Sequence, residues 1–145
     1  GHGGTVNQIE GDGLMAVFGT PIYKDNHREQ AVRAALEMLD LLDGFNQQQA
    51  AQGKVQIQIG IGIASGKMIA GYTGTQHRAT FTCVGDTVNI ASRIEDHTRV
   101  VERPILIDRD TRERLPADIA VEALGPVLFK GKHQPIHIFA VSRAR

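Results

Sequence analysis

The sequence has no second cysteine, no long hydrophobic run and no excess of either charge. Cys83 is the single cysteine among 145 residues, which excludes an internal disulfide and favours a reducing compartment. No apolar run is long enough to span a bilayer and no secretory signal is visible, so we expect a cytoplasmic domain without direct membrane contact. The 16 basic and 16 acidic residues balance, which argues against a nucleic-acid partner.

Several common site motifs are also missing. The six histidines show no metal-ligand spacing, and one cysteine cannot build a structural zinc site. The sequence contains no nucleophile elbow or Ser-His-Asp arrangement. The glycines between residues 60 and 74 match neither the dinucleotide nor the P-loop fingerprint. Zinc-dependent, serine-hydrolase and Rossmann-type chemistry are therefore poor candidates.

What is present is the pattern of one globular α+β domain. Short strands and amphipathic helices are mixed without strict alternation, and tight hairpins join several strands. We therefore expect a mixed, mostly antiparallel sheet with helices packed on one face. The expected strands are 5–10, 14–18, 55–64, 68–72, 79–84, 105–107, 121–129 and 137–141, and the expected helices are 31–45, 87–98 and 109–115.

The segment VQIQIGIGIASG, which starts at Val55, alternates most regularly. Its large apolar residues share one face, which we expect to be core: Val55, Ile57, Ile59, Ile61 and Ile63. Gly60 and Gly62 lie on the other face, where another element can approach the backbone closely. A packed helix or strand is the first expectation there, and a ligand is the alternative.

The hairpin segment QIEGDGLMAVFG, residues 8–19, places Asp12 between two glycines. Asp-Gly is a favoured turn pair for conformational reasons alone, so Asp12 can be simply a turn residue. The second interpretation is a metal ligand, because Mg²⁺ prefers one or two carboxylates together with phosphate oxygens.

Asn89 and Arg93 are four residues apart in a predicted helix and so share one face. An Arg fork suits phosphate oxygens, and an Asn amide can bond a ribose or phosphate oxygen. The alternative is a solvated face on which Arg93 pairs with Glu95 or Asp96.

Lys130 belongs to a Lys-Gly-Lys sequence between two predicted strands. A lysine beside a glycine can bring its ammonium group to a polyphosphate without steric cost. A charged turn without a ligand is the alternative.

Four segments, in their order and wording, resemble the catalytic domain of class III nucleotidyl cyclases: QIEGDGLMAVFG, IGIGIASGKMIAGYTG, RATFTCVGDTVNIASRIE and FKGKHQPIHIFAV. The most specific part is Val-Asn-x-Ala-x-Arg at 88–93, which follows a Gly-Asp-Thr turn. The resemblance extends from about Thr5 to Val141. It implies a ferredoxin-like palm that works as a head-to-tail homodimer and cyclises ATP or GTP to the 3′,5′-cyclic monophosphate for intracellular signalling, releasing pyrophosphate.

The resemblance also implies a role for each candidate residue. Asp12 matches the second of two aspartates that hold two Mg²⁺ or Mn²⁺ ions per active site. Asn89 matches the residue that orients the ribose, and Arg93 matches the one that stabilises charge on the α-phosphoryl group. Lys130 matches a lysine that binds the terminal phosphates.

The sequence departs from the family in its first metal aspartate, which belongs to an upstream Phe-x-Asp motif that is absent here. We therefore expect residues 1–145 to be a single cyclase catalytic domain lacking its first strand, first helix and first metal aspartate. Because both metals need carboxylates, we expect this chain alone to make little cyclic nucleotide.

Base recognition is the second departure. Gln8 and Thr82 fall at the positions that read the purine, where a lysine and an aspartate are typical of adenylyl cyclases. An amide and a hydroxyl are both donor and acceptor, so neither side chain discriminates by itself. Thr82 resembles a bacterial subclass that usually makes cyclic AMP, so we favour ATP over GTP. A guanylyl cyclase and a non-catalytic regulatory or dimerisation module remain alternatives, whereas the Gly-Gly-Asp/Glu-Glu-Phe signature of diguanylate cyclases is absent.

Overall fold

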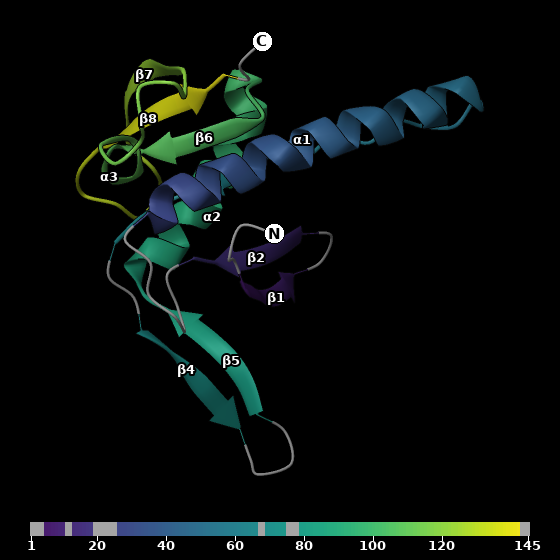
Figure 1. Ribbon diagram of the computed structural model, residues 1–145. Helices are drawn as coiled ribbons and strands as arrows, with labels where there is room; N and C mark the ends of the chain where they lie inside the picture. Colours follow the sequence, from purple (N-terminus) through teal and green to yellow (C-terminus); the bar gives the residue numbers. More distant parts are fainter. Residues whose placement is uncertain (1–4, 11–12, 19–25, 67–68, 75–78, 143–145) are drawn as a thin grey trace.

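The computed structural model describes residues 5–10, 13–18, 26–66, 69–74 and 79–142, and for 5–10, 13–17, 69–74 and 79–84 it describes the backbone alone. The elements (Figure 1) are β1 (Thr5–Glu10), β2 (Gly13–Val17), α1 (His27–Ala51), β3 (Ile61–Ile63), β4 (Ile69–Gly74), β5 (Ala79–Val84), α2 (Asp86–Val101), β6 (Ile105–Asp108), α3 (Arg109–Arg112), β7 (Val121–Val127) and β8 (Ile136–Val141). The predicted α+β class is confirmed.

The central sheet has the strand order β3-β6-β8-β7. β3 pairs with β6 in parallel, and the β6–β8 and β8–β7 pairs are antiparallel. β1 and β2 form one antiparallel hairpin and β4 and β5 form another. Figure 1 shows the β4–β5 hairpin projecting away from the central sheet. The prediction of a mixed, mostly antiparallel sheet is confirmed.

Helices α1 and α2 cover opposite faces of the central sheet. Val32 of α1 packs in one buried cluster with Ile105 and Ile107, whereas Ile94 of α2 packs in another with Leu106. Successive strand residues point to opposite faces, so β6 supplies side chains to both clusters. The expectation that the helices share one face is therefore wrong, and β6 is buried on both sides because a helix covers each.

The glycine face of β3 packs directly on α2. A Cβ atom built on Gly62 would lie 2.6 Å from the carbonyl oxygen of Ala91, and one on Gly60 would collide with the side chain of Thr98. Only a residue without a side chain permits this approach of strand to helix. The expectation of a packed helix against these glycines is confirmed.

The strand predicted over 55–64 is shorter than expected, because only Ile61–Ile63 pairs. Val55, Ile57 and Ile59 are 83%, 46% and 39% exposed, so their assignment to the core is wrong. The backbone of Ile57 bonds instead to the side-chain amide of Asn46, at 2.7 and 2.8 Å. Without a partner strand among the described residues, the alternating pattern leaves this end of the segment on the surface.

Helix α1 is longer than the predicted 31–45, because it begins at His27 and its polar end continues to Ala51. Its first half packs on the sheet, and its second half extends beyond the sheet in Figure 1, with Met38, Leu41 and Phe45 exposed. Among the described residues, no helix is both long and apolar enough to cross a membrane.

Candidate active site

Helix α2 begins immediately after β5, with Gly85 between them. Asp86, Asn89 and Arg93 lie on one face of this helix, because three- and four-residue steps return to the same side. Asn89 is exposed and Arg93 is half-buried. The two predicted catalytic side chains are therefore next to each other, one turn apart.

The loop between β7 and β8 crosses this face of α2 at the turn formed by residues 129–132, which we call the KGK turn. Lys132 forms an ion pair with Asp86 on the first turn of α2. At the other end, the rings of Phe129 and His97 meet edge to face, with centroids 5.5 Å apart. The KGK turn therefore contacts α2 at residues on both sides of Asn89 and Arg93.

Gly131 brings the backbone of the KGK turn against Arg93. Its φ is +84°, and a Cβ atom built on it would lie 3.5 Å from Nη2 of Arg93. The amide of Lys132 donates to the carbonyl oxygen of Phe129 at 3.1 Å, which closes the turn with Lys130 at its first corner. The structure thus places the KGK turn, with Lys130, beside the helix face that carries Asn89 and Arg93.

The alternative pairing of Arg93 does not occur. Glu95 and Asp96 interact with Arg99, at 3.0 and 3.7 Å. Within the described part of the chain, neither Arg93 nor Lys130 has an ion pair, so both cations are available to an anion. The positive end of the α2 dipole adds to their field.

The two predicted base-reading residues lie on neighbouring strands. Gln8 is on β1 opposite Met15, and Thr82 is on β5 opposite Gly71. β1 and β5 contact each other, and Thr82 is three residues before Gly85. The backbone therefore places Thr82 close to the start of α2 and Gln8 on a strand that contacts β5.

The predicted metal ligand, Asp12, lies outside the described residues. Among the residues that are described, no group of three or more His, Cys, Asp and Glu side chains is arranged to hold a metal ion. An aspartate carboxylate has the oxygen donors that Mg²⁺ and Mn²⁺ prefer, so Asp12 fits the chemistry of one ligand.

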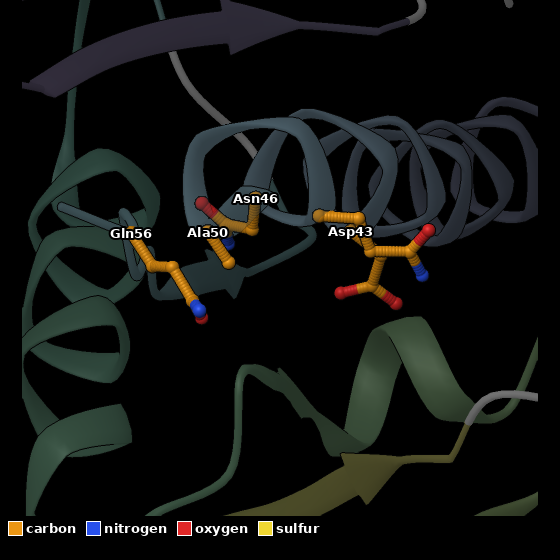
Figure 2. Close-up of a pocket in the computed structure, with 5 residues that line it drawn as sticks. Asp43, Asn46, Ala50 and Gln56 are labelled. Atoms are coloured by element: carbon orange, nitrogen blue, oxygen red, sulfur yellow. The ribbon is translucent and has the colours of Figure 1, made fainter. Parts of the chain in front are cut away.

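A separate hollow of about 240 Å³ lies at the far half of α1. Its lining residues are Asp43, Asn46, Gln47, Ala50 and Gln56, four of which are labelled in Figure 2. None of them is a predicted site residue. This hollow belongs to the end of α1 that extends beyond the sheet, away from the KGK turn.

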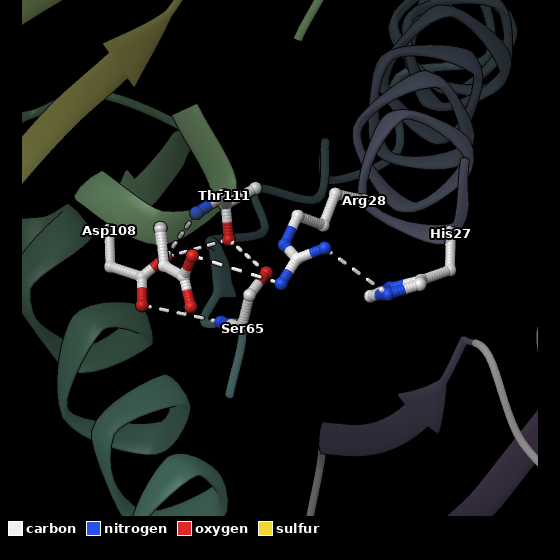
Figure 3. A network of polar contacts seen from close by, with 6 residues as sticks. His27, Arg28, Ser65, Asp108 and Thr111 are labelled. Atoms are coloured by element: carbon white, nitrogen blue, oxygen red, sulfur yellow. Dashed lines mark hydrogen bonds and ion pairs between the residues drawn. The ribbon is translucent and has the colours of Figure 1, made fainter. Parts of the chain in front are cut away.

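A buried polar network surrounds Asp108, which caps the N-terminus of α3. One oxygen of the Asp108 carboxylate accepts from the amide and hydroxyl of Thr111, at 3.0 and 2.6 Å, and the other accepts from the amide of Ser65 at 3.2 Å (Figure 3). Burial raises the pKa of Asp108, although these hydrogen bonds oppose the shift. Arg28 of α1 approaches Asp110 to 3.7 Å beside this network. The network joins α1, α3 and the loop after β3, and it serves the fold.

Comparisons with known proteins agree with this geometry. Residues 4–142 match a family model described as "Adenylate and Guanylate cyclase catalytic domain". Over 140 residues the chain is 31% identical to adenylate cyclase 1 of Rhizobium meliloti (strain 1021), covering 97% of this chain and 21% of that protein.

Two solved structures are close in shape. The adenylyl cyclase CyaB from P. aeruginosa gives a TM-score of 0.88 at 30% identity and covers 99% of this chain and 74% of that one. The guanylyl cyclase Cya2 gives a TM-score of 0.87 at 32% identity, and the match covers 97% of this chain and 70% of that one. The chain thus spans about a fifth of the Rhizobium relative and most of each solved domain.

Proposed function

Because the chain belongs to the adenylate and guanylate cyclase catalytic-domain family, we propose that it is the catalytic part of a nucleotidyl cyclase that converts ATP into 3′,5′-cyclic AMP and pyrophosphate. The observation that carries this proposal is the single surface made by Asn89, Arg93 and the KGK turn. Two cations that form no ion pair with any described residue, beside an amide, suit a nucleoside triphosphate better than they suit a neutral ligand.

In the proposed reaction, the ribose 3′-oxygen attacks the α-phosphorus, the bond to the β-phosphate breaks and pyrophosphate leaves, and the 3′-hydroxyl proton is released. Arg93 stabilises the negative charge that builds on the α-phosphoryl oxygens, and Lys130 binds the terminal phosphates. Asn89 holds the ribose so that its 3′-oxygen is in line with the leaving group. Two Mg²⁺ or Mn²⁺ ions, when bound, supply charge neutralisation and a lowered pKa for the 3′-hydroxyl, and Asp12 is the residue of this chain that would hold them.

The choice of ATP over GTP rests on Thr82 and its resemblance to the bacterial subclass. The neighbouring positions of β1 and β5 support a shared role for Gln8 and Thr82 in reading the base. The compared proteins include both adenylyl and guanylyl cyclases, so the two substrates must be assayed in parallel.

We also propose that the active unit is a head-to-tail homodimer and that residues 1–145 form one catalytic domain without its first metal aspartate. The dimer would complete each site with residues of the other subunit.

The test is a cyclase assay of the full-length protein containing this domain, with Mn-ATP and Mn-GTP in parallel and the products separated by chromatography. We expect cyclic AMP to exceed cyclic GMP, and Asp12→Ala to abolish both products. Residues 1–145 alone should give little product. If the full-length protein made neither product, the non-catalytic module would be the correct interpretation. Equal activity in the wild type and Asp12→Ala would refute the metal role.

A further inference from the structure

We infer that Asp86 and Lys132 are positioning residues: their ion pair holds the KGK turn on the first turn of α2 and leaves Lys130 as the lysine that binds phosphate. This inference deepens the proposed function and rests on it for the identity of the ligand. The Lys-Gly-Lys sequence offers two ammonium groups two residues apart, and it does not show which of them takes the substrate.

The structure distinguishes the two lysines by their surroundings. The side chain of Lys132 is 19% exposed and ends at the carboxylate of Asp86. Lys130 is exposed and has no ion pair within the described residues. A phosphate that approached Lys132 would meet the negative charge of Asp86 at the same place, whereas no carboxylate of the described residues pairs with Lys130.

Lys130 lies between two anchors of the loop. Phe129 packs on His97, and Lys132 forms an ion pair with Asp86. The first and last residues of the turn are therefore both attached to α2. The hydrogen bond from the amide of Lys132 to the carbonyl oxygen of Phe129 closes the turn between these anchors. The point at which the Lys130 side chain leaves the backbone is therefore fixed relative to Arg93 on the same helix.

This arrangement predicts the sign of one mutational effect. If Lys132 bound phosphate itself, removing Asp86 would release its ammonium group and tighten substrate binding. If the ion pair positions the turn, removing Asp86 loosens the turn and weakens binding through Lys130. Asp86→Ala therefore separates the two roles by the direction of the change in KM.

The experiment compares Asp86→Ala and Lys132→Ala with the wild-type full-length cyclase. We expect each variant to raise KM for the nucleoside triphosphate about fivefold to tenfold, with kcat changed less than twofold. The control is Arg103→Ala. Arg103 follows the C-terminal end of α2 and forms an ion pair with Glu122 of β7, away from the site. This variant should leave KM unchanged. A lowered KM in Asp86→Ala would overturn the inference.

A second measurement does not depend on turnover. Hydrogen–deuterium exchange of the loop amides 129–133 should be faster in Asp86→Ala and Lys132→Ala than in the wild type and in Arg103→Ala. Unchanged exchange would overturn the inference even in an active enzyme. Conversely, faster exchange in a protein that made no cyclic nucleotide would support the positioning pair while the proposed function failed.

Discussion

The Nη2 atom of Arg93 lies 3.5 Å from the position that a Cβ atom would occupy on Gly131. This contact joins a helix that follows the β5 strand to a turn that follows β7. It places the KGK turn, which carries Lys130, beside the guanidinium group of Arg93, although the two segments are far apart in the sequence. The surface that we propose for the triphosphate depends on this contact.

Arg93 and Asn89 should be required for turnover. We expect Asn89→Ala and Arg93→Ala in the full-length protein to lower kcat by about 10² to 10³, because each removes a group that acts on the transition state. Arg99→Ala is the matched control on the same helix, since Arg99 makes exposed ion pairs with Glu95 and Asp96. Exposed pairs contribute at most about 1 kcal/mol, so Arg99→Ala should keep near-normal activity. Full activity in Arg93→Ala would contradict the proposed site.

Lys130 should act mainly on substrate binding. We expect Lys130→Ala to raise KM for the triphosphate about tenfold, which corresponds to about 1.4 kcal/mol, because the ammonium group contacts phosphates that are charged before and during the reaction. The loss should shrink as salt rises, since an exposed charge is screened. Steady-state kinetics at two ionic strengths would measure both effects. An unchanged KM would show that another group binds the terminal phosphates.

Gly62 should not tolerate even one methyl group. In Gly62→Ala the new Cβ would lie 2.6 Å from the carbonyl oxygen of Ala91, so strand and helix must separate. We expect a loss of about 1 to 3 kcal/mol in the free energy of unfolding, measured by urea denaturation. Gly44→Ala is the control, because Gly44 lies within α1 and nothing would be within 4 Å of its new methyl group. That variant should gain about 0.5 to 1 kcal/mol, and equal effects of both substitutions would refute the packing argument.

Asp108 should make stability depend on pH. Burial raises its pKa in the folded state, so the native protein binds this proton more tightly than the unfolded chain does. The contribution of this carboxyl group to stability is therefore greatest at pH values below the unfolded pKa, near 3.8, and falls as the pH rises toward and through the raised folded pKa. The unfolding free energy of the wild type minus that of Asp108→Asn should decrease over this range. Asp110→Asn, at a half-exposed carboxylate, is the control. Parallel pH profiles for wild type and Asp108→Asn would contradict the prediction.

Local patterns predicted most elements well. The bounds of β1 and β5 were predicted correctly, because the alternating pattern and the turn glycines beside it are local signals. The pairing of Gly60 and Gly62 with a helix was also predictable, since missing side chains in a strand indicate close approach.

Longer-range features were not predictable in the same way. The apolar residues at 55, 57 and 59 were expected in the core, but a strand pattern does not reveal whether a partner strand is present. The placement of α1 and α2 on opposite faces depends on connections that periodicity does not encode. The ion pair of Asp86 with Lys132 joins positions that no local spacing relates.

The close approach of β3 to α2 has a consequence for motion within the site. With Gly62 against the backbone of Ala91, the helix cannot slide along its axis without a collision, so strand and helix move as one rigid unit. Asn89 and Arg93 are then held in place relative to β3, whereas the exposed Lys130 side chain keeps its freedom of rotation on the anchored turn. An anion that leaves this surface would therefore be followed by the Lys130 side chain alone, while the turn and the helix hold their positions.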